Sequence, residues 1–312
     1  MTGMRGILSK KLKHVSLRGK NLRQKFGTFF KVSLRISRAF LLFAATLMAI
    51  ISGLLTLQNY DDFSRWFNRE FKTEEYWLHA AESLAPEMNV KVFDNTLGEP
   101  VFIGEKAGLT GRTYVNKYFY TQVISDDAQR VALFSITIRK DGFHPKIPYL
   151  RAETVGKGKG ALRLGTFKYT DFTHDLVGLQ YIPGGRRSIY SEVYYFGNSG
   201  NYLYYILSSN DASSVNALGE IKGGRPVTLE DTGFYDGCNS DDHFPGAQSG
   251  RLQYLTTYNL PGLRDLRQKK QPNTISITER GGTFFCKYKD VWKDAELFIF
   301  GPDLDKVRLL ER

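Results

Sequence analysis

Acidic residues are absent from the first 60 positions of this 312-residue chain, and this absence concentrates its positive charge at one end. The first carboxylate belongs to Asp61, whereas residues 1–38 carry eleven Lys and Arg side chains. The formal charge of +11 lies wholly in this basic arm, because the remaining 32 basic residues equal the 32 acidic ones. Residues 58–312 therefore lack the positive excess that nucleic-acid binding requires, and we expect no nucleic-acid partner for them.

Cysteine is also scarce, with only Cys238 and Cys286 in the whole chain. They form no CxxC motif, and no Cys or His lies at zinc-finger spacing, so we predict no metal site and no cofactor. A disulfide between them is compatible with an exported domain. The alternative is two buried free thiols, because Cys286 ends the apolar run that begins at Thr283. The sequence also lacks an Asn-x-Ser/Thr acceptor, which favours a bacterial envelope over a eukaryotic secretory route.

Charge is missing again from residues 39–57, a run of nineteen residues that is apolar on every side. As a helix it would be about 28 Å long, which matches the hydrocarbon core of a bilayer. A buried core helix is seldom apolar on all faces over five turns. A cleaved signal peptide would have a shorter arm and small residues at its cleavage site, which Leu54–Gln58 does not offer. We therefore predict an uncleaved transmembrane signal anchor.

The charges on either side of this run predict its orientation. Only Arg65, Arg69 and Lys72 follow it closely, against the eleven basic residues that precede it. The positive-inside rule then places the N-terminus in the cytoplasm and exports residues 58–312. The expected location is the inner (cytoplasmic) membrane of the cell. A mitochondrial inner-membrane location stays open, because a basic arm without acidic residues also resembles a presequence.

Three cations lie on one helical face just before the apolar run, namely Lys31, Arg35 and Arg38. We expect them at the membrane interface, where they would contact the anionic headgroups of the lipid bilayer. This face would serve mainly to fix the topology. A cytoplasmic docking arm for nucleic acid or a partner protein is the alternative interpretation.

The exported part is rich in aromatic residues and glycine, which favours strands and turns. We predict an α+β fold in which the single transmembrane helix is followed by a β-rich domain of antiparallel hairpins with a few helices. Residues 58–85 are expected to form an aromatic juxtamembrane helix that ends at Pro86. A β-rich lobe should occupy residues 86–210, and residues 211–312 a second β-rich lobe that contains the disulfide.

Alternating hydrophobic patterns locate the individual strands. Two hairpins are expected, one from Tyr114–Ser125 and Arg130–Arg139, the other from Tyr190–Phe196 and Asn201–Leu207. Aromatic residues on both faces of the second hairpin predict that both faces are covered. A further pair is expected between Leu162–Tyr169 and Val177–Ile182. The remaining predicted strands are Val90–Phe93, Val101–Ile103, Leu252–Tyr258, Thr274–Thr278, Thr283–Lys287 and Leu297–Phe300. A turn at Asn95–Pro100 should separate the first two. Asp303 should cap a last helix, Leu304–Leu310.

Catalytic motifs are hard to find in this chain. The weak candidates are Asp241, Asp242 and His243, in a polar loop that could supply ligands for Ca²⁺ or Zn²⁺ or an acid/base pair. The loop departs from the EF-hand pattern, so a solvated loop beside the disulfide is the simpler interpretation. The lysines of Gly156–Gly160 lack phosphate-loop spacing, and Ser199 lies in a turn between two strands rather than in a nucleophile elbow.

These features predict a non-enzymatic, single-pass membrane protein whose exported domain binds another protein, a glycan or a lipid-linked envelope component. Its many Tyr and Trp side chains suit recognition, because they bury a large area at a small loss of entropy. One alternative is an exported hydrolase that uses the Asp241–His243 loop. The other is a membrane effector or sensor that acts through its basic arm. The sequence alone leaves the ligand and the oligomeric state open.

Overall fold

The computed structural model of the chain describes residues 73–156, 158–172, 176–183, 188–218, 224–239, 245, 260, 262–290 and 300–302. All of them belong to the second of two compact units, Arg65–Arg312. None of the helices that these residues form has the length and hydropathy to cross a membrane. The predicted anchor and basic arm lie outside the described residues, as do Lys31, Arg35 and Arg38.

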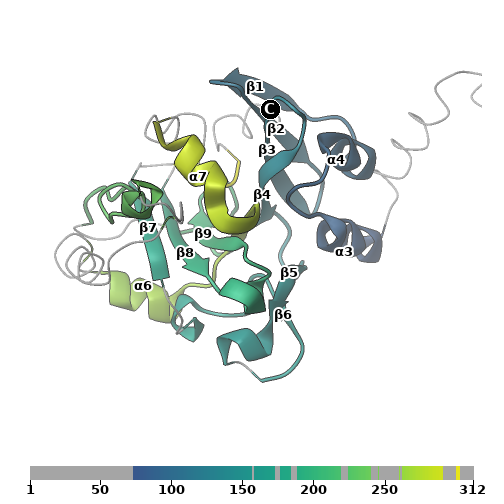
Figure 1. Cartoon of the computed structure of the whole chain (residues 1–312). Coiled ribbons are helices and arrows are strands. Elements are labelled where there is room, and N and C mark those ends of the chain that lie inside the picture. The colour runs from purple at the N-terminus through teal and green to yellow at the C-terminus, as the bar shows by residue number, and fades with distance from the viewer. Residues whose placement is uncertain are drawn as a thin grey trace, which may run out of the picture. The chain divides into compact units, whose positions relative to one another are not determined.

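The core of this unit is an eight-stranded antiparallel sheet with the strand order β1-β2-β3-β4-β10-β9-β8-β7 (Figure 1). The strands are β1 (Phe102–Lys106), β2 (Leu109–Val115), β3 (Phe119–Ser125), β4 (Val131–Ile138), β7 (Leu176–Ile182), β8 (Ile189–Tyr195), β9 (Tyr204–Asn210) and β10 (Thr274–Thr278). The described residues thus form a β-rich domain, and the predicted hairpins β3–β4 and β8–β9 are confirmed. Strand β10 comes from the range 211–312 and lies between β4 and β9, so both predicted lobes contribute to one sheet.

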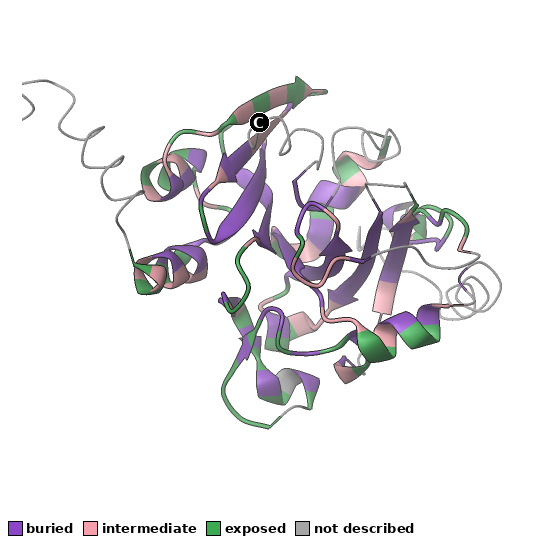
Figure 2. Cartoon of the chain, turned by 180° about the vertical axis from the view of Figure 1, so that it is seen from behind, coloured by how far each residue is buried: buried purple, intermediate pink, exposed green. Residues whose placement is uncertain are grey.

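The central strands are buried on both faces, as the purple ribbons of Figure 2 show. Every residue of β3, β4, β9 and β10 is buried. Strand β1 differs, because its residues alternate between exposed and half-buried at the edge of the sheet. The prediction that both faces of the β8–β9 hairpin are covered is therefore confirmed.

One face of the sheet packs against the helices α3 (Glu74–Ser83), α4 (Val90–Leu97) and α6 (Leu263–Lys269). Trp77 of α3 meets Phe119 edge-on at 5.9 Å between ring centroids, and Phe93 of α4 meets Phe134 at 5.6 Å. Such aromatic pairs add directional packing energy to the burial of apolar area. The same cluster includes residues of a separate two-stranded sheet, β5 (Lys146–Arg151) and β6 (Ala161–Arg163).

The other face carries the short helix α7 (Thr283–Lys287) and the disulfide. Cys238 and Cys286 are bonded, with their Cα atoms 5.1 Å apart, so the predicted disulfide is confirmed. It joins α7 to the 3-10 turn η4 (Asp236–Asn239). A disulfide of this kind is typical of proteins in oxidising, extracytoplasmic compartments.

Two predicted strands are helices. Val90–Phe93 opens helix α4, because Asn89 caps it by accepting the amide hydrogen of Lys91 at 3.0 Å, and because Val90, Phe93 and Leu97 bury one face. The predicted turn therefore begins only at Gly98. Thr283–Lys287 forms α7, which follows Gly281 and Gly282 in left-handed conformations.

Two pairing predictions also need correction. The predicted strand Tyr114–Ser125 is interrupted where the Asn116 side chain accepts the amide hydrogens of Tyr118 and Phe119, so it divides into β2 and β3. Leu162–Tyr169 does not pair with Val177–Ile182, because the short β6 pairs with β5 whereas β7 pairs with β8.

The remaining elements are confirmed in part. Thr274–Thr278 is strand β10, and the described part of the predicted 58–85 helix is α3, which ends at Ser83, before Pro86. Leu252–Tyr258, Leu304–Leu310 and all of Leu297–Phe300 except its last residue lie outside the described residues.

Candidate functional site

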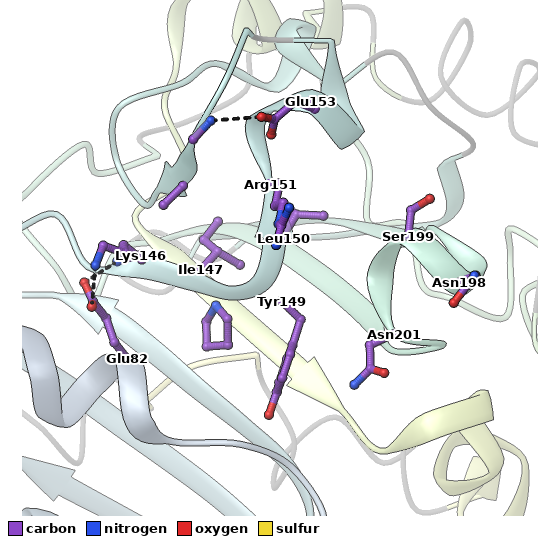
Figure 3. Close-up of a pocket in the computed structure, with 13 residues that line it drawn as sticks. Glu82, Lys146, Ile147, Tyr149, Leu150, Arg151, Glu153, Asn198, Ser199 and Asn201 are labelled. Atoms are coloured by element: carbon purple, nitrogen blue, oxygen red, sulfur yellow. Dashed lines mark hydrogen bonds and ion pairs between the residues drawn. The ribbon is translucent and has the colours of Figure 1, made fainter.

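A cleft of about 740 Å³ opens between β5 and the 3-10 turn η3 (Gly197–Gly200), which joins β8 to β9 (Figure 3). We call residues Lys146–Arg151 the β5 lip and residues Gly197–Asn201 the η3 lip. The cleft is lined by Glu82, Lys146, Ile147, Pro148, Tyr149, Leu150, Arg151, Glu153, Gly160, Ala161, Asn198, Ser199 and Asn201. Its volume falls within the range of about 300–1,000 Å³ that is usual for small-molecule sites.

The β5 lip presents an aromatic ring to solvent. The register between β5 and β6 shifts between Lys146 and Arg151, so this stretch of β5 is bulged. Ile147 and Leu150 are buried there, whereas Tyr149 stays 52% exposed. Tyr149 has a φ of 60°, a left-handed conformation that bulky side chains rarely adopt. Bulges often redirect a side chain in this way near functional sites, so the local backbone displays this ring at a cost in strain.

The η3 lip supplies polar side chains. Asn198, Ser199 and Asn201 line the cleft, and within the described part of the chain their side chains make no hydrogen bond. The turn packs tightly at Gly200, where a Cβ atom would lie 2.8 Å from the Cβ of Phe196 and 3.1 Å from the ring of Tyr205. Two amides and a hydroxyl are therefore held on a rigid turn and stay available to a ligand.

Tyr205 of β9 joins the two lips. Its hydroxyl lies 3.1 Å from the carbonyl oxygen of Gly200 and 3.3 Å from that of Pro148, and it donates its proton to this pair. The side chain is fully buried, and burial raises the pKa of Tyr205, so the hydroxyl stays protonated. The sheet thus fixes the distance between Tyr149 and the amides of the η3 lip.

The charges of the cleft balance. Lys146 pairs with Glu82 of α3 at 3.1 Å, and the same carboxylate accepts the amide hydrogen of Lys146 at 3.2 Å. Glu153 accepts the amide hydrogen of Gly160 at 3.2 Å, and Arg151 makes no ion pair within the described residues. Two cations and two carboxylates line the cleft, so its net charge is zero.

A second polar cluster lies inside the domain, where no motif in the sequence indicates it. Glu192 of β8 is fully buried and accepts hydrogen bonds from the hydroxyls of Tyr190 and Tyr194. Its carboxylate lies 2.7 Å from Nε of Arg267 in α6, and Arg267 also donates to the carbonyl oxygen of Tyr169 at 3.3 Å. Burial raises the pKa of Glu192, while Arg267 and the two hydroxyls oppose that shift. Nε of Arg267 makes an ion pair but no hydrogen bond within the described residues, whereas Nη2 donates to Oε2 of Glu192 at 3.4 Å, so charge and the tyrosine hydroxyls together fasten α6 to the sheet.

The residues singled out in the sequence lie elsewhere. Asp241, Asp242 and His243 fall outside the described residues, so their role stays a prediction. Among the residues that the structure describes, no group of three or more His, Cys, Asp or Glu side chains is placed to hold a metal ion. Ser199, rejected as a nucleophile, lies in the cleft but in a turn between two strands.

Comparisons with known proteins add little to this description. No protein-family model matches the sequence, and no curated protein matches it. A solved structure described as a cysteine-rich secretory protein (SAV1118) from Staphylococcus aureus subsp. aureus Mu50 aligns with 64% of this chain and 96% of that chain, at 10% identity. The TM-score of 0.24 does not indicate a shared fold.

Proposed function

We propose that this chain is a non-enzymatic, single-pass membrane-anchored protein whose exported domain binds a component of the cell envelope in the cleft between the β5 and η3 lips. The observation that supports this proposal is an exposed tyrosine ring that lines the same cleft as three polar side chains, which make no hydrogen bond in the described part of the chain.

The composition of the two lips favours recognition. The η3 lip, Gly197–Asn201, together with Tyr149 consists of Tyr, Asn, Ser and Gly only, the residue types that enrich the binding loops of antibodies. Tyrosine offers a large contact area with few rotatable bonds, and Asn and Ser adapt their hydrogen bonds to the ligand. The sheet beneath holds these groups in place through Tyr205.

The chemistry of the cleft does not favour catalysis. The carboxylate of Glu82 is engaged by Lys146, and one oxygen of Glu153 accepts the Gly160 amide hydrogen. Ser199 has no base within hydrogen-bond distance among the described residues. An activated nucleophile needs such a neighbour. Binding without a covalent step is therefore the activity that this arrangement supports best.

The test measures binding of the full chain, held in lipid nanodiscs, to three fractions of cell envelope: proteins, polysaccharides and lipids. The cleft variant is Asn198→Ala combined with Asn201→Gly. The control is Asn216→Gly, which also replaces a half-buried Asn of left-handed φ, outside the cleft. We expect one fraction to bind the wild type and the control alike, and the cleft variant to bind it at least about tenfold more weakly.

Two further variants separate the alternatives. Deletion of residues 2–30 should leave binding unchanged, because the cleft lies in the exported domain; loss of binding would favour an effector that acts through its basic arm. Alanine at Asp241, Asp242 and His243 together should also leave it unchanged. Binding by no fraction, or equal binding by the cleft variant and the wild type, would refute the proposed function.

A further inference from the structure

We infer that the ligand of this cleft is a neutral saccharide chain, of which one pyranose ring stacks on Tyr149. This inference rests on the proposed function and names the chemical class that the cleft recognises.

The ring of Tyr149 provides the apolar part of the site. It is 52% exposed and makes no ring contact within the described residues. The face of an aromatic ring is electron-rich, so it attracts the positively polarised C–H groups that cover one face of a pyranose. Tyr149 has a left-handed φ, as Tyr202 also has, but of the two only Tyr149 lines the cleft.

The polar side chains of the cleft match the hydroxyl groups of a sugar. Each hydroxyl donates one hydrogen bond and accepts others, and an amide such as Asn198 or Asn201 also does both. The Oε2 atom of Glu153 accepts no hydrogen bond within the described residues, and the Arg151 guanidinium offers donors at the same end of the cleft. Donors and acceptors are therefore both present in the cleft; Figure 3 shows Asn201 beside the Tyr149 ring, with Asn198 and Ser199 further along the η3 lip and Glu153 at the opposite end.

The charge of the cleft argues for a neutral ligand. A polyanion requires an excess of cations, and a polycation requires an excess of carboxylates. The residues that line the cleft have neither, because Lys146 and Arg151 are balanced by Glu82 and Glu153, and Lys146 is already paired with Glu82 at 3.1 Å. Arg163, outside the lining, lies 4.0 Å from the same carboxylate. Acidic saccharides and charged peptides would gain no electrostatic attraction here.

The size of the cleft argues for a chain rather than a single sugar. A volume of about 740 Å³ leaves room for more than one ring. At the two lips, Tyr149, Arg151, Asn198, Ser199 and Asn201 are exposed or half-buried, so the ends of a longer chain would continue into solvent. A run of linked rings would place one ring on Tyr149 and its neighbours beside Asn201 on one side and Arg151 on the other.

In the test, the full chain in nanodiscs is titrated with neutral hexasaccharides of β-1,4-glucose, α-1,4-glucose, mannose and N-acetylglucosamine. The heat of binding is measured by isothermal titration calorimetry. The variant Tyr149→Asn removes the ring and keeps a residue that tolerates a left-handed φ. The matched control is Tyr202→Asn, because Tyr202 is 49% exposed, also has a φ of 60° and does not line the cleft. Tyr149→Phe retains the ring without its hydroxyl.

We expect at least one hexasaccharide to bind with a Kd below about 1 mM. Tyr149→Asn should weaken that binding at least about tenfold, while Tyr202→Asn and Tyr149→Phe should stay within about threefold of the wild type. Equal losses in the two Asn variants would overturn the inference, because they would show no special role for the Tyr149 ring.

Two other results would also overturn it and would leave the proposed function standing. One is the absence of binding by every neutral hexasaccharide while the envelope protein fraction still binds through Asn198 and Asn201. The other is tighter, salt-sensitive binding of heparin or polygalacturonate, which would show that the cleft selects charge.

Discussion

Removal of the Arg267 guanidinium should destabilise the domain strongly, because it leaves the carboxylate of Glu192 buried without a cation. Glu192 is fully buried, and its carboxylate lies 2.7 Å from Nε of Arg267. Breaking a buried ion pair by removing one partner costs about 3–5 kcal/mol. We therefore expect Arg267→Met, which keeps most of the apolar stem, to lower the free energy of unfolding by that amount at pH 8.

The stability that Arg267→Met loses should increase as the pH rises. Burial raises the pKa of Glu192 above its unfolded value, so the folded state holds the proton more tightly. Protonation of Glu192 therefore contributes to the free energy of unfolding, fully at pH values below the unfolded-state pKa, and this contribution is lost as the pH rises through the folded-state pKa. Arg267 lowers that pKa, so Arg267→Met moves the window to higher pH. The deficit of the variant should grow by up to about 1.4 kcal/mol for each pH unit across this window.

The assay is guanidinium unfolding of the full chain in detergent, at pH 5, 6.5 and 8, with the disulfide intact. Glu192→Gln provides the matched control, because it removes the charge while it keeps the size of the side chain. We expect the double variant Arg267→Met/Glu192→Gln to be more stable at pH 8 than Arg267→Met alone. A deficit below about 1 kcal/mol, or one that is the same at all three pH values, would refute the reasoning.

Three further perturbations have expected outcomes. Tyr205→Phe removes the hydroxyl that joins the two lips, so it should cost about 1 kcal/mol in denaturant unfolding and weaken saccharide binding in calorimetry. Reduction of the bond between Cys238 and Cys286 should lower stability by about 4 kcal/mol, because the loop spans 48 residues; equal denaturation midpoints with and without reductant would contradict this. Tyr149→Asn should raise the free energy of unfolding by about 1 kcal/mol, because Asn adopts the left-handed φ at less cost, and Tyr202→Asn should do the same for the same reason.

The sequence predicted the parts of the fold whose signal is local. The β3–β4 and β8–β9 hairpins are long alternating runs around short polar turns, and both are confirmed. Val90–Phe93 and Thr283–Lys287 were predicted as strands and are helices. A run of four or five apolar residues fits either period, so the cap at Asn89 and the glycines before Thr283 decided the outcome.

The pairing of distant strands could not be predicted from local pattern. Strand β10 lies between β4 and β9, although it is 64 residues from β9 and more than 130 from β4 along the chain. Hydroxyl pairs hold it there, with Ser276 at 2.6 Å from Ser135 and Thr274 at 2.8 Å from Thr137. Small polar residues in a strand predict solvent exposure when they are taken alone, so only the assembled sheet shows that they bond to each other across strands.

The cleft could not be predicted from the sequence, because it also forms between segments that are distant along the chain. No strand or helix was predicted for its β5 lip, and its η3 lip was recognised only as a hairpin turn. Neither has a motif, because their function arises when the hydroxyl of Tyr205 fixes the carbonyls of Pro148 and Gly200 on opposite sides of one cleft. The composition of Gly197–Asn201 was the one available signal, since Asn, Ser and Gly together are typical of binding loops.

The buried Glu192–Arg267 cluster and the cleft have different roles: the cluster stabilises the domain, and the cleft is the proposed binding site. In the buried Glu192–Arg267 pair, the carboxylate accepts hydrogen bonds from Tyr190 and Tyr194 and is paired with the guanidinium, which holds α6 to the sheet. The cleft has the opposite character, because its amides stay unpaired within the described residues and its exposed tyrosine is strained. Gly or Asn at position 149 would adopt the left-handed φ at less cost than Tyr. Tyr202 carries the same strain outside the cleft, so strain alone does not mark a site; at Tyr149 it coincides with an exposed ring and with amides that make no hydrogen bond within the described residues, and this combination points to ligand binding.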